Sequence, residues 1–178
     1  MLSGETAIGA YPLEAVATMR QVICATETHF QSQTGRSTTE PHVSVPEAMS
    51  TVIPILCRSL PITKIVAITR SGYAARMIAV HRLRQPILAV SDDVAAARCF
   101  NLIAGTYGIF SEVSFSKTST DHMMQVLKML LEKGHVAKSD VVLITGVCYP
   151  TPGSRMNTVQ IHNIGDLCSV YNWSDDAK

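Results

Sequence analysis

Apolar positions along the chain recur at two spacings, which predict helices alternating with strands. After Pro12, a residue that the first turn of a helix tolerates, apolar side chains follow at helical intervals to residue 23. From residue 46 onward, short β-branched runs typical of strands alternate with segments of helical spacing. The expected helices cover residues 46–60, 72–83, 91–101 and 119–134, and the expected strands cover 64–69, 86–90, 106–110, 141–145 and 159–164.

The order of these elements predicts an α/β fold. Strands and helices joined by short connections require right-handed crossovers, so the strands should form a parallel sheet with helices on both faces. The last connection is too short for a crossover helix, which predicts an antiparallel strand at the edge of the sheet. We therefore expect a three-layer sandwich with a five-stranded, mainly parallel sheet. Within this domain, Pro54 should bend the helix over 46–60 or loosen one of its turns, and Ser91 or Asp92 should cap the helix that ends at residue 101.

A polar stretch divides the chain. Residues 32–45 have the composition of a linker, so we expect a first segment over 1–31, an α/β domain over 46–164 and a tail over 165–178. The first seven residues have the pattern of a strand end and its exit loop, with nothing before them to complete the strand. This pattern predicts that the sequence is a fragment of a longer protein.

Composition and charge narrow the functional classes. At 178 residues and 47% hydrophobic, the chain can bury one sizeable core. A net charge of +1 with 16% charged residues gives no electrostatic reason to expect nucleic acid or an anionic membrane as a partner, although small anions remain possible. We find neither an apolar run of membrane-spanning length nor a secretory pattern.

Cysteines and histidines offer no metal motif. The five cysteines are scattered without a CxxC pair, which favours reduced, mostly buried thiols and a cytoplasmic location over disulfides or a metal site. The histidines lack HxxxH or HExxH spacing. We therefore expect no metal and no cofactor in this chain. His122, near a helix start, is expected to be solvated.

The loop after the first strand carries the clearest candidate chemistry. Ligands of open α/β sheets bind outside the carboxyl ends of the strands. Here Thr69, Arg70, Ser71 and Gly72 combine hydroxyls, a cation and a glycine at a helix start, which suits a phosphate group. An ordinary capped helix start explains the same residues equally well. Absence of GxGxxG and of a Walker lysine argues against a nucleotide-binding enzyme.

Several segments in order resemble the pyruvate kinase family. The opening Met-Leu-Ser-Gly-Glu-Thr-Ala is similar to the passage from the eighth strand of the catalytic barrel into its last helix. Residues 46–72, 82–90 and 140–153 resemble successive pieces of the carboxy-terminal domain of that family. The resemblance covers about three quarters of the chain and ends near residue 164. It implies that residues 1–31 are the end of the barrel.

The resemblance implies a site for a sugar-phosphate effector. The Thr-x-Ser-Gly-x-Ser loop that grips a phosphate maps onto Thr69, Arg70, Ser71, Gly72 and the position of Ala74, where the second serine is missing. The loop over residues 146–158 resembles the effector loop, from which Gly153, Ser154 and Arg155 are expected to contribute. A solvated loop arginine is the plain alternative for Arg155. Ala74 and the bulk of Tyr73 both weaken the expected site. The resemblance also implies that the neighbourhood of His122 borders the effector site.

The resemblance also implies a role within a larger enzyme. The full enzyme would be a cytoplasmic glycolytic transferase that moves phosphate from phosphoenolpyruvate to ADP with magnesium and potassium. The catalytic residues would lie in earlier barrel strands, so this chain should sense an allosteric effector and be inactive alone. We expect its partners to be the missing barrel and further copies of the chain, joined at the edge strand through Val159, Ile161 and Ile164. The alternative is a stand-alone module that binds a small phosphorylated metabolite or only oligomerises.

Overall fold

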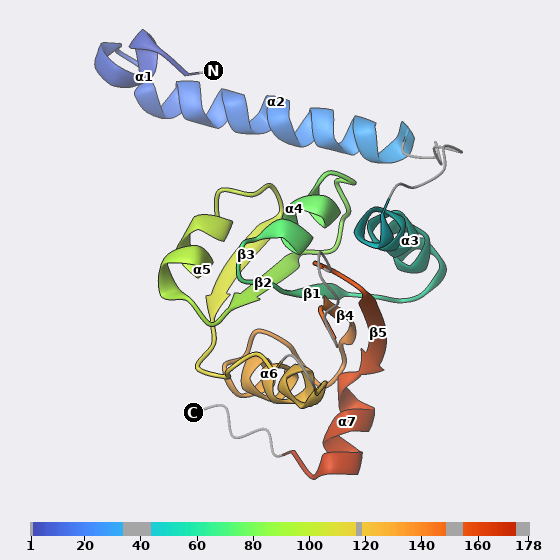
Figure 1. Cartoon of the computed structure of the whole chain (residues 1–178). Helices are drawn as coiled ribbons and strands as arrows, with labels where there is room; N and C mark the ends of the chain where they lie inside the picture. The colour runs from blue at the N-terminus through green and yellow to red at the C-terminus, as the bar shows by residue number, and fades with distance from the viewer. Residues whose placement is uncertain (1, 34–43, 117–118, 149–154, 174–178) are drawn as a thin grey trace. The chain divides into compact units, whose positions relative to one another are not determined.

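The computed structural model describes residues 2–33, 44–116, 119–148 and 155–173, and the chain separates into two compact units, Met1–Thr38 and Thr39–Lys178. The first unit holds helices α1 (Gly4–Ile8) and α2 (Pro12–Gln33) (Figure 1). The expected exit loop at its start is therefore wrong, because residues from Gly4 onward are helical. Local hydrogen bonds explain this: the amide of Gly9 donates to the carbonyl of Glu5, whose carboxylate accepts from the amide of Tyr11 at 2.8 Å.

The second unit has the predicted α/β fold. Its elements are α3 (Val45–Ser59), β1 (Lys64–Ile68), α4 (Tyr73–Ala79), β2 (Ile87–Ser91), α5 (Val94–Phe100), β3 (Thr106–Phe110), α6 (Asp121–Glu132), β4 (Val141–Gly146), β5 (Thr158–Asn163) and α7 (Ile164–Tyr171). The strand order is β3-β2-β1-β4-β5. Strands β1 to β4 pair in parallel, whereas β5 pairs antiparallel to β4 at the edge, which confirms the sequence prediction.

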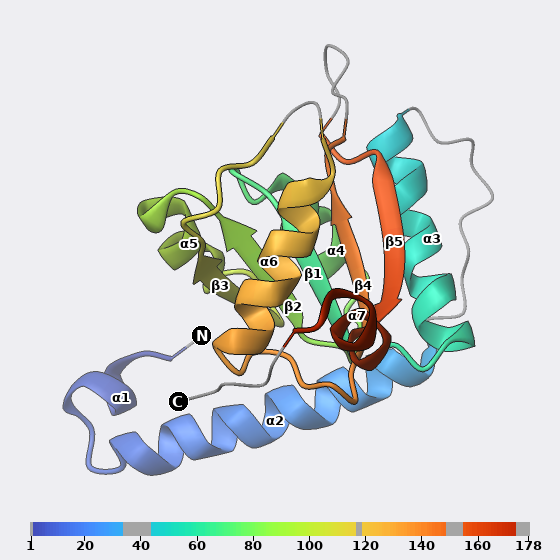
Figure 2. The same cartoon turned by 90° about the horizontal axis from the view of Figure 1, so that it is seen from below.

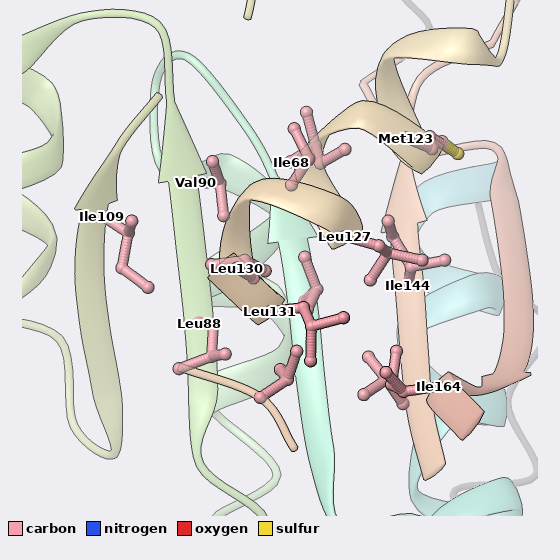
Figure 3. Close-up of a cluster of buried hydrophobic side chains, with 14 of the residues drawn as sticks. Ile68, Leu88, Val90, Ile109, Met123, Leu127, Leu130, Leu131, Ile144 and Ile164 are labelled. Carbon is pink, nitrogen blue, oxygen red and sulfur yellow. The ribbon is translucent and has the colours of Figure 1, made fainter. Parts of the chain in front are cut away.

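Helices cover both faces of the sheet (Figures 1 and 2). Helices α3, α4 and α5 pack on one face through a cluster that includes Ile53, Ile78 and Phe100. Helices α6 and α7 cover the other face, where Leu127, Leu130 and their neighbours contact the strands (Figure 3). The buried positions of α6 fall at intervals of three and four residues, so one stripe of the helix faces the sheet.

Helix α3 runs from Val45 to Ser59 and contains the buried Pro54, as expected for a helix that a proline interrupts without ending. One helix cap differs from expectation. The cap of α5 is Asp93 and neither Ser91 nor Asp92: the Oδ1 atom of Asp93 accepts from the amide of Ala96 at 2.7 Å. Ser91 ends β2, and Asp92 pairs with an arginine described below.

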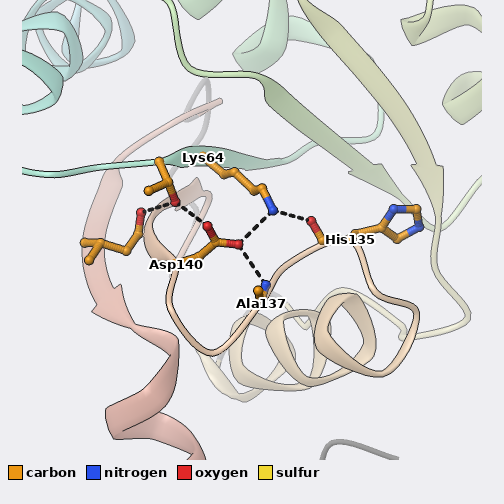
Figure 4. Close-up of polar contacts among 6 residues, drawn as sticks. Lys64, His135, Ala137 and Asp140 are labelled. Carbon is orange, nitrogen blue, oxygen red and sulfur yellow. Dashed lines mark hydrogen bonds and ion pairs between the residues drawn. The ribbon is translucent and has the colours of Figure 1, made fainter. Parts of the chain in front are cut away.

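A polar network ties β1 to β4 at their amino ends (Figure 4). The carboxylate of Asp140 accepts from Lys64 Nζ at 2.7 Å, from the hydroxyl of Thr63 at 2.8 Å and from the amide of Ala137 at 2.7 Å. Burial alone would raise the pKa of Asp140, but these hydrogen bonds outweigh it and lower the pKa below its ordinary 3.8. The ionised carboxylate therefore links the amino ends of two neighbouring strands.

The tail contains an element that the sequence did not predict. Helix α7 begins directly after β5, with Asn163 as its cap, and Trp173 packs against the cluster beneath α6. Ile164 is fully buried, so its expected place on an exposed edge is wrong. In the described part of the chain, no helix is both long and apolar enough to cross a membrane.

Candidate anion-binding site

The sheet topology marks one place where ligands are expected. From β1 the chain crosses to β2 and then β3 on one side, whereas β4 lies on the other side of β1. The connections therefore diverge at the carboxyl ends of β1 and β4, which is the switch point where open α/β sheets bind their ligands.

A cavity of about 510 Å³ lies at this point. Its walls come from the end of β1 and the loop after it, from α4, from the segment before α6, and from the segments that follow β4 and precede β5. The lining residues are Ile68, Thr69, Arg70, Ser71, Tyr73, Arg76, Phe115, Ser116, His122, Val147 and Arg155. The described lining thus contains three arginines and several hydroxyls but no aspartate or glutamate, which suits an anion.

Gly72 shapes the wall of the cavity. It precedes α4 with a left-handed backbone, φ +72°, which favours glycine. A Cβ atom at this position would lie 2.7 Å from Cε1 of Phe100, so the loop also approaches α5 too closely for a side chain. The sequence therefore needs glycine here for two independent reasons.

The three arginines have different surroundings. Arg70 is held by the carboxylate of Asp92, with Nη2 2.6 Å and Nε 3.0 Å from its oxygens. Arg76 donates to the carbonyl of Ser71 at 2.7 Å. Arg155 lies over the ring of Tyr73, 4.9 Å from its centroid, and forms no ion pair with any described residue. Arg155 is therefore the cation most available to an anion in the cavity.

His122 lies in the wall of the cavity and is almost fully buried, with 3% of its surface exposed. The expectation of a solvated side chain is wrong because α6 turns this position inward. Nδ1 lies 3.0 Å from the carbonyl oxygen of Ser119, and the ring packs 5.9 Å from that of Phe115. Burial lowers the pKa of His122 below 6.5, and the bond to Ser119 and the charge of Asp121 only partly oppose this.

The described residues offer no metal centre. No group of three or more His, Cys, Asp or Glu side chains comes together in the part of the chain that the structure describes. The cavity itself is lined by arginines, which disfavour a cation.

Comparison with known proteins identifies the family. The profile of the family described as "Pyruvate kinase, alpha/beta domain" matches residues 47–162, which is more than half of the chain. The chain belongs to this family. The matched range begins in α3 and ends in β5, so it includes both loops that border the cavity.

Full-length relatives extend the match beyond the pyruvate kinase α/β domain. The chain is 34% identical over 170 residues to a pyruvate kinase of Sporosarcina psychrophila, 32% over 171 residues to that of Bacillus licheniformis, and 33% over 171 residues to that of Geobacillus stearothermophilus. Each alignment covers 94% of this chain but only 28% of the relative. The chain thus spans little more than a quarter of the length of these pyruvate kinases.

The fold brings together only some of the residues expected from the pyruvate kinase motifs. Thr69, Arg70, Ser71 and Arg155 line the cavity, and Gly72 supports its wall. Ala74 is fully buried in the apolar cluster beneath α4 and is not among the described lining residues. Gly153 and Ser154 lie outside the described residues.

Other lining residues were missed by sequence reasoning. Phe115 and Ser116 come from the segment before α6, and no sequence motif connects them with the loop after β1. For His122 the family resemblance indicated only that its neighbourhood borders the effector site. Arg76 could have been predicted as a lining residue, because it lies four residues after Gly72 and so one helical turn beyond the predicted loop.

Proposed function

We propose that this chain is the regulatory domain of a pyruvate kinase and that its cavity binds the phosphate group of a small metabolite, with a sugar phosphate as the expected class. The observation that carries the proposal is the lining at the switch point, where three arginines and the hydroxyls of Thr69, Ser71 and Ser116 meet without a described carboxylate. Charge-assisted hydrogen bonds from such groups favour a doubly charged oxyanion.

The arrangement of charges supports a site for one phosphate group. Arg155 is exposed and free of ion pairs with described residues, whereas Arg70 already shares its charge with Asp92. Tyr73 holds the guanidinium of Arg155 by a cation–π contact, which orders the side chain before the anion arrives. A ligand would therefore be attracted chiefly by Arg155 and Arg76, neither of which pairs with a described carboxylate, and by the hydroxyls.

Calorimetric titration with inorganic phosphate and with fructose 1,6-bisphosphate tests this proposal. Ser71→Asp places a carboxylate in the cavity and should weaken binding at least about tenfold through repulsion. Gln125→Glu is the matched control, because it adds the same charge at an exposed position of α6. Equal weakening in both variants, or no heat with either ligand, would contradict the proposal.

The relatives are named pyruvate kinases. The resemblance to that family implies a parent protein that would transfer phosphate from phosphoenolpyruvate to ADP, using magnesium and potassium bound in a catalytic barrel. We propose that this chain supplies regulation and no catalytic residue. A lactate dehydrogenase-coupled assay of the purified chain should give no turnover above background. Turnover that resists removal of host enzyme would overturn this part of the proposal.

We also propose self-association through β5. This strand is paired only with β4 in the sheet, so its outer edge presents backbone groups that a second copy can pair with across a two-fold axis. Sedimentation at high micromolar concentration should detect dimers. A strictly monomeric profile would argue against an interface at this edge.

A further inference from the structure

The hydrogen bond of His122 fixes the tautomer of its neutral ring. Nδ1 lies 3.0 Å from the carbonyl oxygen of Ser119, and because a carbonyl can only accept, Nδ1 must carry a proton. In the neutral ring Nε2 is then an acceptor with a free lone pair. Nε2 has no hydrogen-bond partner among the described residues, although the side chain is 97% buried and its ring lines the cavity.

A neutral ring of this kind is a poor neighbour for an oxyanion. Its Nε2 lone pair would face the lone pairs of phosphate or sulfate oxygens, so the contact would be repulsive. Addition of a proton to Nε2 converts the acceptor into a charged donor and the repulsion into a charge-assisted hydrogen bond. The proton comes from solvent, and no other bond changes.

We propose that His122 is an anion-binding residue of this cavity and that a bound oxyanion is held by its protonated Nε2, so that binding takes up one proton. This inference rests on the proposed function and adds regulation by pH to the same site. It predicts that the domain binds its effector more tightly as the surroundings become more acidic.

The charges around the ring support this coupling. Arg70, Arg76 and Arg155 line the same cavity from the loop after β1, from α4 and from the segment before β5, so a bound anion beside the ring would also face these cations. Asp92 offsets part of the charge of Arg70, and Asp121 favours protonation from the same helix. Tyr73 is the remaining ionisable group among the described lining residues.

The consequence for affinity follows from linkage. Burial keeps the free ring neutral at pH 7 to 8, because its pKa lies below 6.5. A doubly negative ion beside Nε2 favours the protonated ring. Between the free and the bound pKa values, uptake of one proton changes affinity about tenfold per pH unit. Sulfate is the better probe, because phosphate monoesters themselves ionise near pH 6.

The test is calorimetric titration of the whole chain with sodium sulfate at pH 6 and pH 8, at constant ionic strength and in two buffers of different ionisation enthalpy. We expect sulfate to bind at least about tenfold more tightly at pH 6, with close to one proton taken up. His122→Gln retains a polar side chain but cannot ionise, and should reduce the pH dependence to less than about twofold. His135→Gln, an exposed histidine at the other end of the sheet, is the matched control and should keep it.

The outcomes separate the two proposals. Sulfate binding of equal affinity at both pH values, with no proton uptake, would overturn the role of His122 and leave the anion site in place. Strong pH dependence that persists in folded His122→Gln would equally overturn it, since the proton would then be taken up elsewhere. No sulfate binding at any pH would count against both. Proton uptake is measured on the unmodified chain, so the test does not depend on the folding of a variant.

Discussion

Replacing Gly72 by alanine should destabilise the domain more than the same change at other left-handed glycines. Gly72, Gly105 and Gly134 have φ angles of +72°, +65° and +71°. A Cβ at Gly105 or Gly134 would meet nothing within 4 Å, whereas at Gly72 it would lie 2.7 Å from the ring of Phe100. The three positions share one backbone penalty, and only Gly72 adds a steric clash.

The structure sets the expected magnitudes. The left-handed conformation costs a non-glycine residue about 1–2 kcal/mol, which should be the whole effect of Gly105→Ala or Gly134→Ala. Overpacking against a buried ring adds typically about 1–3 kcal/mol, so Gly72→Ala should cost about 2–5 kcal/mol in total. Because domains of this size are stabilised by only about 5–15 kcal/mol, the difference should be easy to measure.

Urea unfolding followed by circular dichroism gives the three free energies of unfolding under identical conditions. Adding Phe100→Leu to Gly72→Ala should recover the steric part, since the shorter side chain removes the ring atoms that clash. A clash between positions 72 and 100 is contradicted if Gly72→Ala costs no more than the other two substitutions, or if the double variant shows no coupling between these positions.

Three further predictions concern stability. Asp140→Asn should lower the free energy of unfolding by roughly 1.5–3 kcal/mol at pH 7, measured by urea, because Lys64 loses its charged acceptor. Because the pKa of Asp140 is lowered in the folded chain, its carboxylate stabilises the fold fully above about pH 5, and this contribution is lost as the pH falls through the folded-state pKa, below 3.8. The free energy of unfolding of Asp140→Asn should therefore decrease less steeply in acid than that of the unmodified chain. Leu127→Ala should cost about 2–5 kcal/mol by the same measurement, whereas exposed Lys128→Ala should change it little. Burial lowers the pKa values of His81, His122 and His162 below 6.5. The neutral rings therefore contribute their full share to the free energy of unfolding above about pH 6.5, and this share is lost as the pH falls toward the lowered pKa values. A urea midpoint that does not decrease between about pH 7.5 and pH 5 would contradict this.

The sheet was predictable because local signals agreed with the global fold. The β-branched runs were short and bounded by turns, and the connection between β4 and β5 was too short to reach a parallel position. Element ends were less predictable. Helix α4 ends at Ala79, earlier than expected, because Arg82 adopts a left-handed turn at φ +47° that its side-chain type does not announce.

Only the part of the candidate site formed by the loop after β1 was predictable from the sequence. The loop after β1 is a contiguous motif, so Thr69, Ser71 and Gly72 could be found in the sequence. His122 comes from a different face of the sheet, and its burial depends on how α6 packs. Likewise, the pairing of Arg70 with Asp92 joins two loops through space, and it decides which arginine remains available to a ligand.

The measurement that tests the account most directly is a titration of the isotope-labelled chain with inorganic phosphate, followed by amide chemical shifts. We predict saturable shifts at Thr69, Ser71, Ser116 and His122 and on the side chain of Arg155, all of which line the cavity at the carboxyl ends of β1 and β4. The absence of any saturable shift, or shifts confined to residues elsewhere such as Arg82, would contradict an anion-binding site at this switch point.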